Sequence, residues 1–221
     1  YFALSKSAML IINSEAEAYC NSISESEPSV LKEIRRDTYV NVMQPRMLSG
    51  HFQGRLLSLI SNLMRPKRIL EIGTYTGYSS ICLAEGLAKG GKVISIDVNE
   101  ELEDRINSNF VKSGNEDKIQ FMAGDAADII PGLNETFDLV FIDADKRNYE
   151  KYFDLIIDKV KLDGLIISDN VLWDGKVFDT NAKDLTTKAV REYNLKLKEN
   201  KRIQTVLLPI RDGLLVARKI S

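Results

Sequence analysis

Four polar side chains that can bind a metal or move a proton follow two apolar runs of this sequence. Asp143 and Lys146 follow the run Leu-Val-Phe-Ile, and Asp169 and Asn170 follow the run Leu-Ile-Ile-Ser. If the two runs are neighbouring strands, two carboxylates and one amide oxygen are aimed at one point. Oxygen ligands suit a hard divalent cation such as Mg²⁺ or Ca²⁺, with other positions left to water or substrate. Zinc is disfavoured, because no histidine or cysteine stands nearby.

Lys146 lies three residues after Asp143. A cation bound beside Lys146 would favour its neutral amine, the form that a general base needs. Without a cation, Asp143, Asp145 and Asp169 would repel one another. Trp173, the only tryptophan, can stack on a flat substrate ring. The alternatives are a surface lysine, an unrelated set of loop acids and a packing role for the tryptophan.

Residues 68–80 form a second group, with the sequence Arg-Ile-Leu-Glu-Ile-Gly-Thr-Tyr-Thr-Gly-Tyr-Ser-Ser. An apolar run, two glycines and a helical spacing of apolar residues predict a strand, a tight turn and a helix. Glycine accepts positive φ and leaves room for a ligand to touch the backbone. Tyr75 stands where a pyrophosphate-binding turn has its middle glycine. The turn therefore favours S-adenosylmethionine over a nicotinamide cofactor.

Three side chains near this turn support that choice. Asp97 ends the next strand about 20 residues after the glycines, the position from which a carboxylate binds ribose hydroxyls. Glu71 would repel a pyrophosphate but favour a ligand that carries an ammonium and a sulfonium. Ser79 can donate a hydrogen bond to a ligand carboxylate, or it is an ordinary helix-start serine. A turn without any ligand and a solvated Glu71 are the alternatives.

The elements that must position these residues alternate regularly after Arg68. We expect strands at 68–72, 92–97, 119–123, 137–142, 164–168, 203–208 and 214–217. We expect helices at 50–63, 76–88, 100–113, 126–130, 149–160 and 184–199. Continuous apolar strands are typical of a parallel sheet that is covered on both faces. The five residues between the last two strands allow only an antiparallel hairpin.

The predicted fold is therefore a doubly wound α/β sheet of seven mostly parallel strands with an antiparallel C-terminal hairpin, preceded by N-terminal helices. With 221 residues and 44% hydrophobic content, the chain can bury one full core. We expect a helical appendage over residues 1–48 and a single globular unit over residues 49–221.

The composition excludes several other classes of protein. A net charge of -2 does not indicate a nucleic-acid or membrane-surface partner. Cys20 and Cys82 are too few for a disulfide framework, which favours a reducing cytoplasm, and Cys82 is expected on a buried helix face. His51, the only histidine, is expected to be structural or on the surface.

No apolar run approaches the ~18 residues of a membrane span. Because the numbering begins at Tyr1 rather than methionine, it leaves room for an upstream segment, including a removed signal peptide.

Three stretches together resemble the cation-dependent class I O-methyltransferases, the family of catechol and plant caffeoyl-CoA O-methyltransferases, and especially their small bacterial members. The stretches are Leu-Glu-Ile-Gly-Thr-Tyr-Thr-Gly-Tyr-Ser at 70–79, Ile-Asp-Ala-Asp-Lys at 142–146 and Ser-Asp-Asn-Val-Leu-Trp at 168–173. The resemblance extends over nearly the whole chain from about Val42. It implies a Rossmann-like fold, S-adenosylmethionine as methyl donor, a divalent cation and a homodimer in which the N-terminal helices are a candidate lid or interface.

The resemblance also implies a role for each matching position. Contacts with S-adenosylmethionine fall on Ser49, Glu71, Gly73, Thr74, Ser79, Asp97, Ala126 and Asp145. Metal ligation falls on Asp143, Asp169 and Asn170, proton abstraction on Lys146 with Asp143 beside it, and acceptor contacts on Trp173 and Asp174. Plant members carry threonine at Ser49 and glutamate at Gln53, so we expect substrate contacts there to differ. They carry asparagine at Asp174, near the acyl substrate, which weakens the transfer of specificity for a coenzyme A thioester.

Our hypothesis is methyl transfer to a hydroxyl of a small catechol-type acceptor. The two diol oxygens would bind the cation, one hydroxyl would lose its proton to Lys146, and in-line attack on the sulfonium methyl would follow. One alternative within the transferase class is O-methylation of 5-hydroxyuridine in tRNA, which the mildly acidic charge disfavours. Alternatives of other classes are a nicotinamide-dependent oxidoreductase and a ligand-binding module without catalysis.

Overall fold

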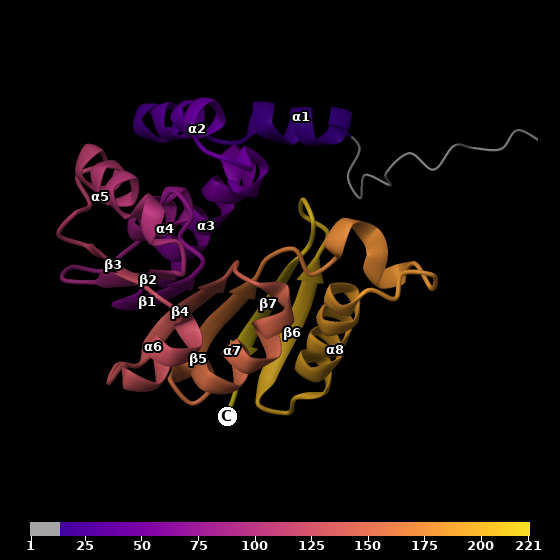
Figure 1. Ribbon diagram of the computed structural model, residues 1–221. Coiled ribbons are helices and arrows are strands. Elements are labelled where there is room, and N and C mark those ends of the chain that lie inside the picture. The colour runs from indigo at the N-terminus through magenta and orange to yellow at the C-terminus, as the bar shows by residue number, and fades with distance from the viewer. Residues whose placement is uncertain (1–13) are drawn as a thin grey trace, which may run out of the picture.

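The computed structural model describes residues 14–221 and has a seven-stranded sheet at its centre (Figure 1). The strand order is β3-β2-β1-β4-β5-β7-β6. Strands β1 to β5 pair in parallel, and β7 runs antiparallel to both β5 and β6. The predicted fold class is thereby confirmed. The strands are β1 (Arg68–Ile72), β2 (Lys92–Asp97), β3 (Ile119–Ala123), β4 (Phe137–Ile142), β5 (Val160–Ser168), β6 (Ile203–Leu208) and β7 (Leu214–Lys219).

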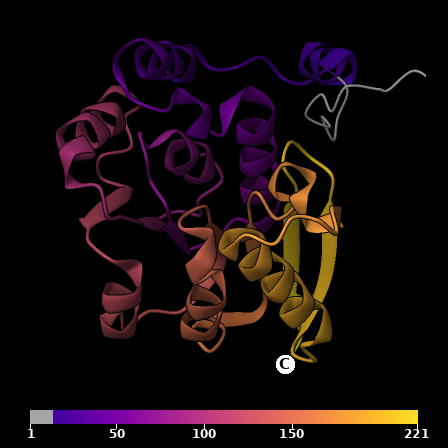
Figure 2. The ribbon, with the colours of Figure 1, turned by 45° about the vertical axis from the view of Figure 1, so that its right-hand side comes forward.

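Helices cover both faces of the sheet. The α-helices are α1 (Ser14–Ile23), α2 (Ser29–Asn41), α3 (Gly50–Met64), α4 (Tyr78–Ala84), α5 (Glu103–Lys112), α6 (Ala126–Gly132), α7 (Tyr149–Ile156) and α8 (Leu185–Glu199). Helices α2 to α5 lie on one side of the sheet and α6 to α8 on the other (Figure 2). The side chains of α2 to α5 share one core cluster with one face of the sheet, and those of α6 to α8 share a second cluster with the other face. Burial on both faces explains why the central strands are continuous apolar runs.

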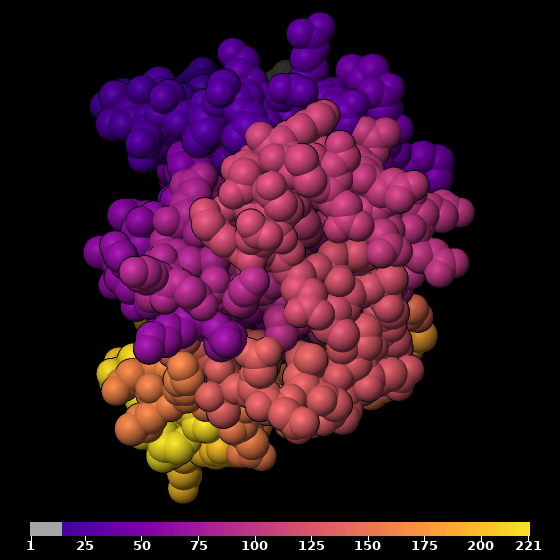
Figure 3. Space-filling model, turned by 90° about the vertical axis from the view of Figure 1, so that its left-hand side faces the viewer, coloured from indigo at the N-terminus to yellow at the C-terminus, as the bar shows by residue number. Residues whose placement is uncertain are grey.

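The N-terminal helices lie along one end of the molecule, where Figure 3 shows their indigo side chains. Helix α2 is amphipathic and buries Leu31 and Ile34 in the same core cluster as α3 and α4. The Thr38 hydroxyl donates a hydrogen bond to Thr76 Oγ1 at 3.2 Å, which joins α2 to the glycine turn. The expected helical character of residues 1–13 lies outside the described residues, and the division of the chain at residue 48 stays a prediction.

Some element boundaries differ from those expected. The helix predicted over 149–160 is wrong at its end, because Val160 is buried and pairs with Phe137 as the first residue of β5. The helix predicted over 76–88 is also too long. It begins only after Gly77, whose φ of 82° is left-handed, and it ends before Gly86, which packs on the backbone of α3. The described residues also contain short 3-10 segments, η1 (Pro45–Met47), η2 (Glu100–Leu102), η3 (Lys146–Asn148) and η4 (Trp173–Phe178). η1 and η2 fall within regions predicted to be helical, whereas the sequence did not predict η3 or η4.

The glycines of the turn are required by the protein's own packing. Gly73 and Gly77 have φ values of 102° and 82°, so the expected positive φ is confirmed. A Cβ on Gly73 would lie 1.9 Å from the backbone carbonyl oxygen of Asp143. A Cβ on Gly77 would lie 2.6 Å from the ring of Phe110. The room that these glycines leave is therefore filled by β4 and α5, and Gly73 lets the end of β1 approach the end of β4.

Gly73→Ala should destabilise the protein far more than the matched change Gly114→Ala. Both glycines have positive φ, but a Cβ on Gly114 meets nothing within 4 Å. Gly114→Ala should therefore cost only the backbone strain of about 1 kcal/mol. Gly73→Ala must also separate β1 from β4, which adds about 2 kcal/mol or more to the loss of unfolding free energy. Urea unfolding of the two variants measures the difference, and equal losses would contradict the packing role of Gly73.

Candidate functional site

A cavity of about 1010 Å³ opens at the carboxyl ends of the parallel strands. Its walls come from the loops after β1, β2, β3, β4 and β5, from the segment before α3 and from the loop between β6 and β7. Every site residue that the sequence predicted lines this cavity except Glu71. The lining residues among them are Ser49, Gly73, Thr74, Ser79, Asp97, Ala126, Asp143, Asp145, Lys146, Asp169, Asn170, Trp173 and Asp174.

The hydrogen-bond ladder of the sheet sets the position of the central side chains. The ladder continues one step past the strands, where the Asp143 N–H donates to Ile72 O at 2.8 Å and the Asp169 N–H donates to Ile142 O at 2.9 Å. Because each residue directly follows a strand in parallel register, Asp143 lies between the ends of β1 and β5. The predicted meeting of Asp143 and Asp169 thus follows from the backbone.

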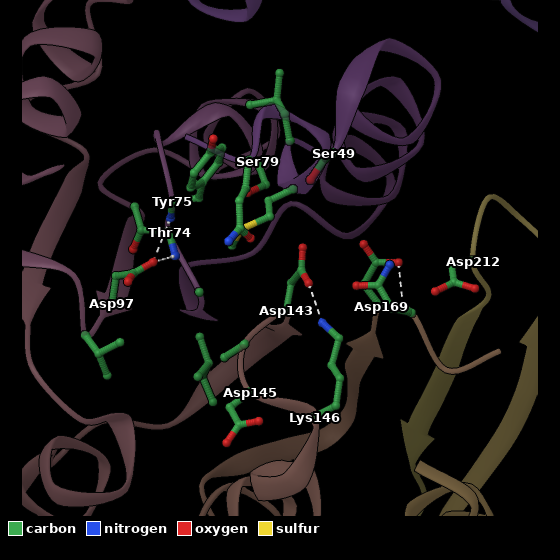
Figure 4. A pocket seen from close by; sticks show the side chains of 18 of the residues that line it. Ser49, Thr74, Tyr75, Ser79, Asp97, Asp143, Asp145, Lys146, Asp169 and Asp212 are labelled. Atoms are coloured by element: carbon green, nitrogen blue, oxygen red, sulfur yellow. Dashed lines mark hydrogen bonds and ion pairs between the residues drawn. The ribbon is translucent and has the colours of Figure 1, made fainter. Parts of the chain in front are cut away.

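Asp143 and Asp169 form an acidic pair beside a single lysine (Figure 4). The Lys146 ammonium lies 2.8 Å from Asp143 Oδ1. Asp169 is 1% exposed, and it accepts hydrogen bonds from Gln53 Nε2 and from the Asn170 backbone N–H, each at 2.7 Å. Burial, together with the negative charge of Asp143, raises the pKa of Asp169 to about 7. The pair therefore carries an unfavourable excess of negative charge, which a bound cation would relieve.

The side chains of the predicted metal site fit a hard cation only if an amide oxygen and water molecules serve as further ligands. Within residues 14–221, no group of three or more histidine, cysteine, aspartate or glutamate side chains is arranged to hold a metal. The predicted set has two carboxylates, and its third member is the amide of Asn170. Asn170 adopts a left-handed φ of 57°, which asparagine tolerates better than most residues. A hard cation that keeps several waters suits such a sparse set of oxygen ligands.

Glu71 is buried beside the glycine turn, which excludes the solvated alternative. It is 0% exposed, and its Oε2 accepts hydrogen bonds from the hydroxyls of Ser80 and Ser95, the latter at 2.5 Å. Burial raises the pKa of Glu71 to about 7, although hydrogen bonds from Ser79, Ser80 and Ser95 oppose the shift. Its Oε1 has no hydrogen-bond partner. Ser79 lines the cavity, so Glu71 lies directly behind the cavity wall.

Asp97 has a structural role that the sequence did not reveal. Its Oδ2 accepts the backbone N–H groups of Thr74 and Tyr75 at 2.9 and 2.7 Å, and its Oδ1 accepts that of Asn99 at 2.9 Å. The carboxylate therefore fixes the glycine turn while it lines the cavity (Figure 4). Oδ1 accepts only one of these hydrogen bonds and retains further acceptor capacity, so a ribose hydroxyl can still bind there.

The loop after β5 has an unusual backbone. Trp173 and Asp174 have φ values of 49° and 52°, a region that bulky residues rarely adopt. The Asp174 N–H donates to Asp212 Oδ1 at 2.6 Å, which ties this loop to the β6–β7 hairpin. Lys176 Nζ lies 5.6 Å from the centroid of the Trp173 ring. Strain held in place by neighbouring elements is common at ligand sites, and here it places Trp173 in the cavity wall.

Three residues shape the cavity in ways that the sequence did not predict. Arg211 and Asp212 belong to the hairpin loop and reach the ends of the parallel strands only in the folded chain. Tyr75 donates a hydrogen bond to Met43 O at 2.9 Å and so holds the segment that precedes η1 near the cavity. No spacing rule links these residues to the acidic pair.

Residues outside the cavity behave largely as expected. His51 Nε2 lies 2.7 Å from Glu25 O and connects α3 with the segment between α1 and α2. Cys82 is buried, as predicted, and Cys20 is exposed; both are free. Among the described residues, no helix is both long enough and apolar enough to span a membrane.

Comparisons with known proteins agree on one family. The model of the O-methyltransferase family matches residues 21–220. A caffeoyl-CoA O-methyltransferase of Petroselinum crispum is 36% identical over 213 residues, which cover 90% of this chain and 88% of that protein. A probable caffeoyl-CoA O-methyltransferase of Arabidopsis thaliana is 33% identical over 213 residues, which cover 90% of this chain and 90% of that protein.

Solved structures give the same picture. A methyltransferase of Podospora anserina bound to SAH (S-adenosylhomocysteine) superposes with a TM-score of 0.87 at 28% identity, covering 95% of this chain and 97% of that one. An O-methyltransferase of Bacillus cereus in complex with SAH has a TM-score of 0.85 at 28% identity, covering 93% and 97%.

Glu71→Gln should reduce the dependence of stability on pH in the protein without added ligand. Glu71 ionises near its ordinary value of 4.5 in the unfolded chain but near 7 in the folded state. Between these values the folded state binds more protons, so the free energy of unfolding falls as the pH rises. The difference in pKa corresponds to a loss on the order of 3 kcal/mol, which Glu71→Gln should remove. Urea unfolding at about pH 5 and pH 8 measures it.

The control variant is Asp128→Asn, which replaces an exposed carboxylate of α6 instead of a buried one. Asp169 shifts stability in the same direction as Glu71, so the slope becomes smaller in Glu71→Gln without vanishing. Parallel pH profiles for wild type and Glu71→Gln would contradict a buried, protonated Glu71.

Proposed function

Because the chain belongs to the O-methyltransferase family, we propose that it transfers the methyl group of S-adenosylmethionine to a hydroxyl of a small catechol-type acceptor with the help of a divalent cation. The observation that carries the cation and the acceptor is the acidic pair, the partly buried Asp143 and the buried Asp169, with Lys146 beside it. The resemblance to caffeoyl-CoA O-methyltransferases supports a phenolic acceptor.

The donor would bind at the β1–β2 side of the cavity. Two similar solved structures hold SAH, which supports the same ligand in this chain. We assign the ribose to Asp97, the adenine to the start of α6 at Ala126, and the amino-acid end to Ser49 and Ser79. The remaining assigned contacts are Glu71, Gly73, Thr74 and Asp145. The acidic character of this wall favours a ligand that carries an ammonium and a sulfonium.

The acceptor would bind at the β4–β5 side. Asp143, Asp169 and Asn170 would hold the cation, which supplies Lewis acidity and makes an acceptor hydroxyl more acidic. The Lys146 amine, fixed beside Asp143, would take the hydroxyl proton. Trp173 would stack on the acceptor ring.

Positioning should account for most of the rate. A methyl transfer needs the acceptor oxygen, the methyl carbon and the sulfur in line, and holding two reactants in this way can lower a barrier by about 7 to 11 kcal/mol. The glycine turn, which would bind the methyl donor, and the acidic pair are joined through Gly73 and the Asp143 backbone, so adjacent strands hold the two binding sites together.

Asp174 lies at the acceptor side of the cavity and would contribute to acceptor choice.

We further propose a cytoplasmic homodimer. The two free cysteines suit a reducing compartment. Large apolar side chains are exposed on α1 and α3, where a partner subunit would cover them. They are Tyr19, Ile23, Leu59 and Leu63.

One assay tests the proposed reaction. Purified protein is incubated with labelled S-adenosylmethionine and with small catechols, caffeoyl-type esters or bulk tRNA, each with Mg²⁺ or with excess chelator. We expect methylation of a catechol-type acceptor that chelation abolishes and added Mg²⁺ restores. Asp143→Ala should lower turnover at least about 100-fold while S-adenosylhomocysteine still binds. Asp128→Ala, on the exposed face of α6, should leave turnover unchanged.

The arms of the assay separate the alternatives. Undiminished turnover under chelation would contradict the cation, and methyl transfer to tRNA alone would contradict a small phenolic acceptor. Turnover that survives Asp143→Ala would contradict the assignment of the acidic pair.

A further inference from the structure

A buried glutamine contacts Asp169 of the acidic pair. Gln53 lies on α3 and is 0% exposed. Its Nε2 donates to Asp169 Oδ2 at 2.7 Å, and its Oε1 accepts from Arg211 Nη1 at 3.1 Å. A chain of hydrogen bonds therefore runs from the β6–β7 hairpin through α3 to the carboxylate at the end of β5.

Arg211 determines which way the Gln53 amide points. The guanidinium group has donors only, so the atom of Gln53 that faces it must be the carbonyl oxygen. The amide NH₂ then faces Asp169, which is acceptor-only when ionised. The orientation needs no assumption about protonation, and it directs a donor at one oxygen of the carboxylate. The other oxygen accepts the Asn170 N–H at 2.7 Å, so both oxygens of Asp169 are held.

Placing a neutral amide between Arg211 and Asp169 has an electrostatic consequence. An arginine in direct contact with Asp169 would form an ion pair and compete with a metal for the carboxylate. The amide transmits the orienting effect but carries no formal charge. Asp169 is thus oriented without an ion pair to Arg211 that would compete with a cation in the cavity.

Arg211 also reaches the donor side of the cavity. It donates hydrogen bonds to the backbone carbonyl oxygens of Ser49 and of Leu48, the latter at 3.2 Å. Arg211 therefore touches the segment that contains a proposed donor contact and, through Gln53, the proposed metal ligand. Its φ of 49° is left-handed, and the hairpin holds it there between two antiparallel strands.

We propose that Gln53 is a positioning residue for the cation, holding the Asp169 carboxylate in its ligating orientation, and that Arg211 positions both Gln53 and the donor segment at Ser49. This inference rests on the proposed cation site. Gln53 should therefore affect the binding of the metal only, whereas Arg211 should affect the binding of both the metal and the methyl donor.

The test measures binding instead of turnover. Mn²⁺ binding is followed by the electron paramagnetic resonance of free Mn²⁺, and S-adenosylhomocysteine binding by calorimetry without metal. Gln53→Met keeps the length of the side chain and removes both hydrogen bonds. It should weaken Mn²⁺ about 10- to 100-fold, the usual effect of removing an outer-shell partner, and change S-adenosylhomocysteine binding less than twofold. Arg211→Gln should weaken both ligands. Gln204→Met, at an exposed position of β6, should change neither.

Three results would overturn the inference. The first is Mn²⁺ affinity within twofold of wild type in a Gln53→Met variant that still binds S-adenosylhomocysteine. If Gln53→Met does not fold, Arg211→Gln provides the test. The second overturning result is an unchanged Mn²⁺ affinity in Arg211→Gln. The third is the absence of Mn²⁺ binding by wild type, which would also remove the cation from the proposed function. If wild type binds Mn²⁺ and neither variant changes that affinity, this inference is contradicted while the proposed function still stands.

Discussion

The constraint on which the site depends is the placement of two like charges, the partly buried Asp143 and the buried Asp169, at the ends of adjacent strands. Parallel register places Asp143 and Asp169 side by side, and the sheet leaves neither backbone free to move apart. Burial, and the repulsion between two carboxylates in this position, raise the pKa of Asp169. Lys146, Gln53 and the Asn170 N–H each offset part of that repulsion. A divalent cation would offset the rest. The repulsion between the two carboxylates is therefore also the reason to expect a cation, and with it the proposed chemistry, at this site.

The donor side depends on the same strand ends. Gly73 permits the Asp143 carbonyl to lie against the glycine turn, so the two halves of the cavity meet at one backbone contact. Asp97 holds the other side of the turn through the N–H groups of Thr74 and Tyr75. A displacement of β4 would therefore move the acidic pair and the donor turn together. This arrangement suits a reaction in which two substrates must be aligned.

Much of this fold could be predicted because the strands are apolar runs that end in polar residues. The same feature located Asp143, Asp169 and Asn170, since strand ends gather at one edge of a parallel sheet. The sequence could not predict Gln53 or Arg211. Gln53 lies 116 positions from Asp169, and their contact depends on how α3 and the hairpin fold over the sheet. The burial of Glu71 was missed for a similar reason, because the serines that surround it come from separate elements.

The most direct test of the acidic pair as a cation site is an anomalous difference map from crystals grown with MnCl₂ and S-adenosylhomocysteine. The account predicts a peak within about 2.6 Å of side-chain oxygens of Asp143, Asp169 and Asn170, the upper distance for hard divalent cations bound to oxygen. A map with no peak between the two carboxylates, in crystals that hold S-adenosylhomocysteine, would contradict it.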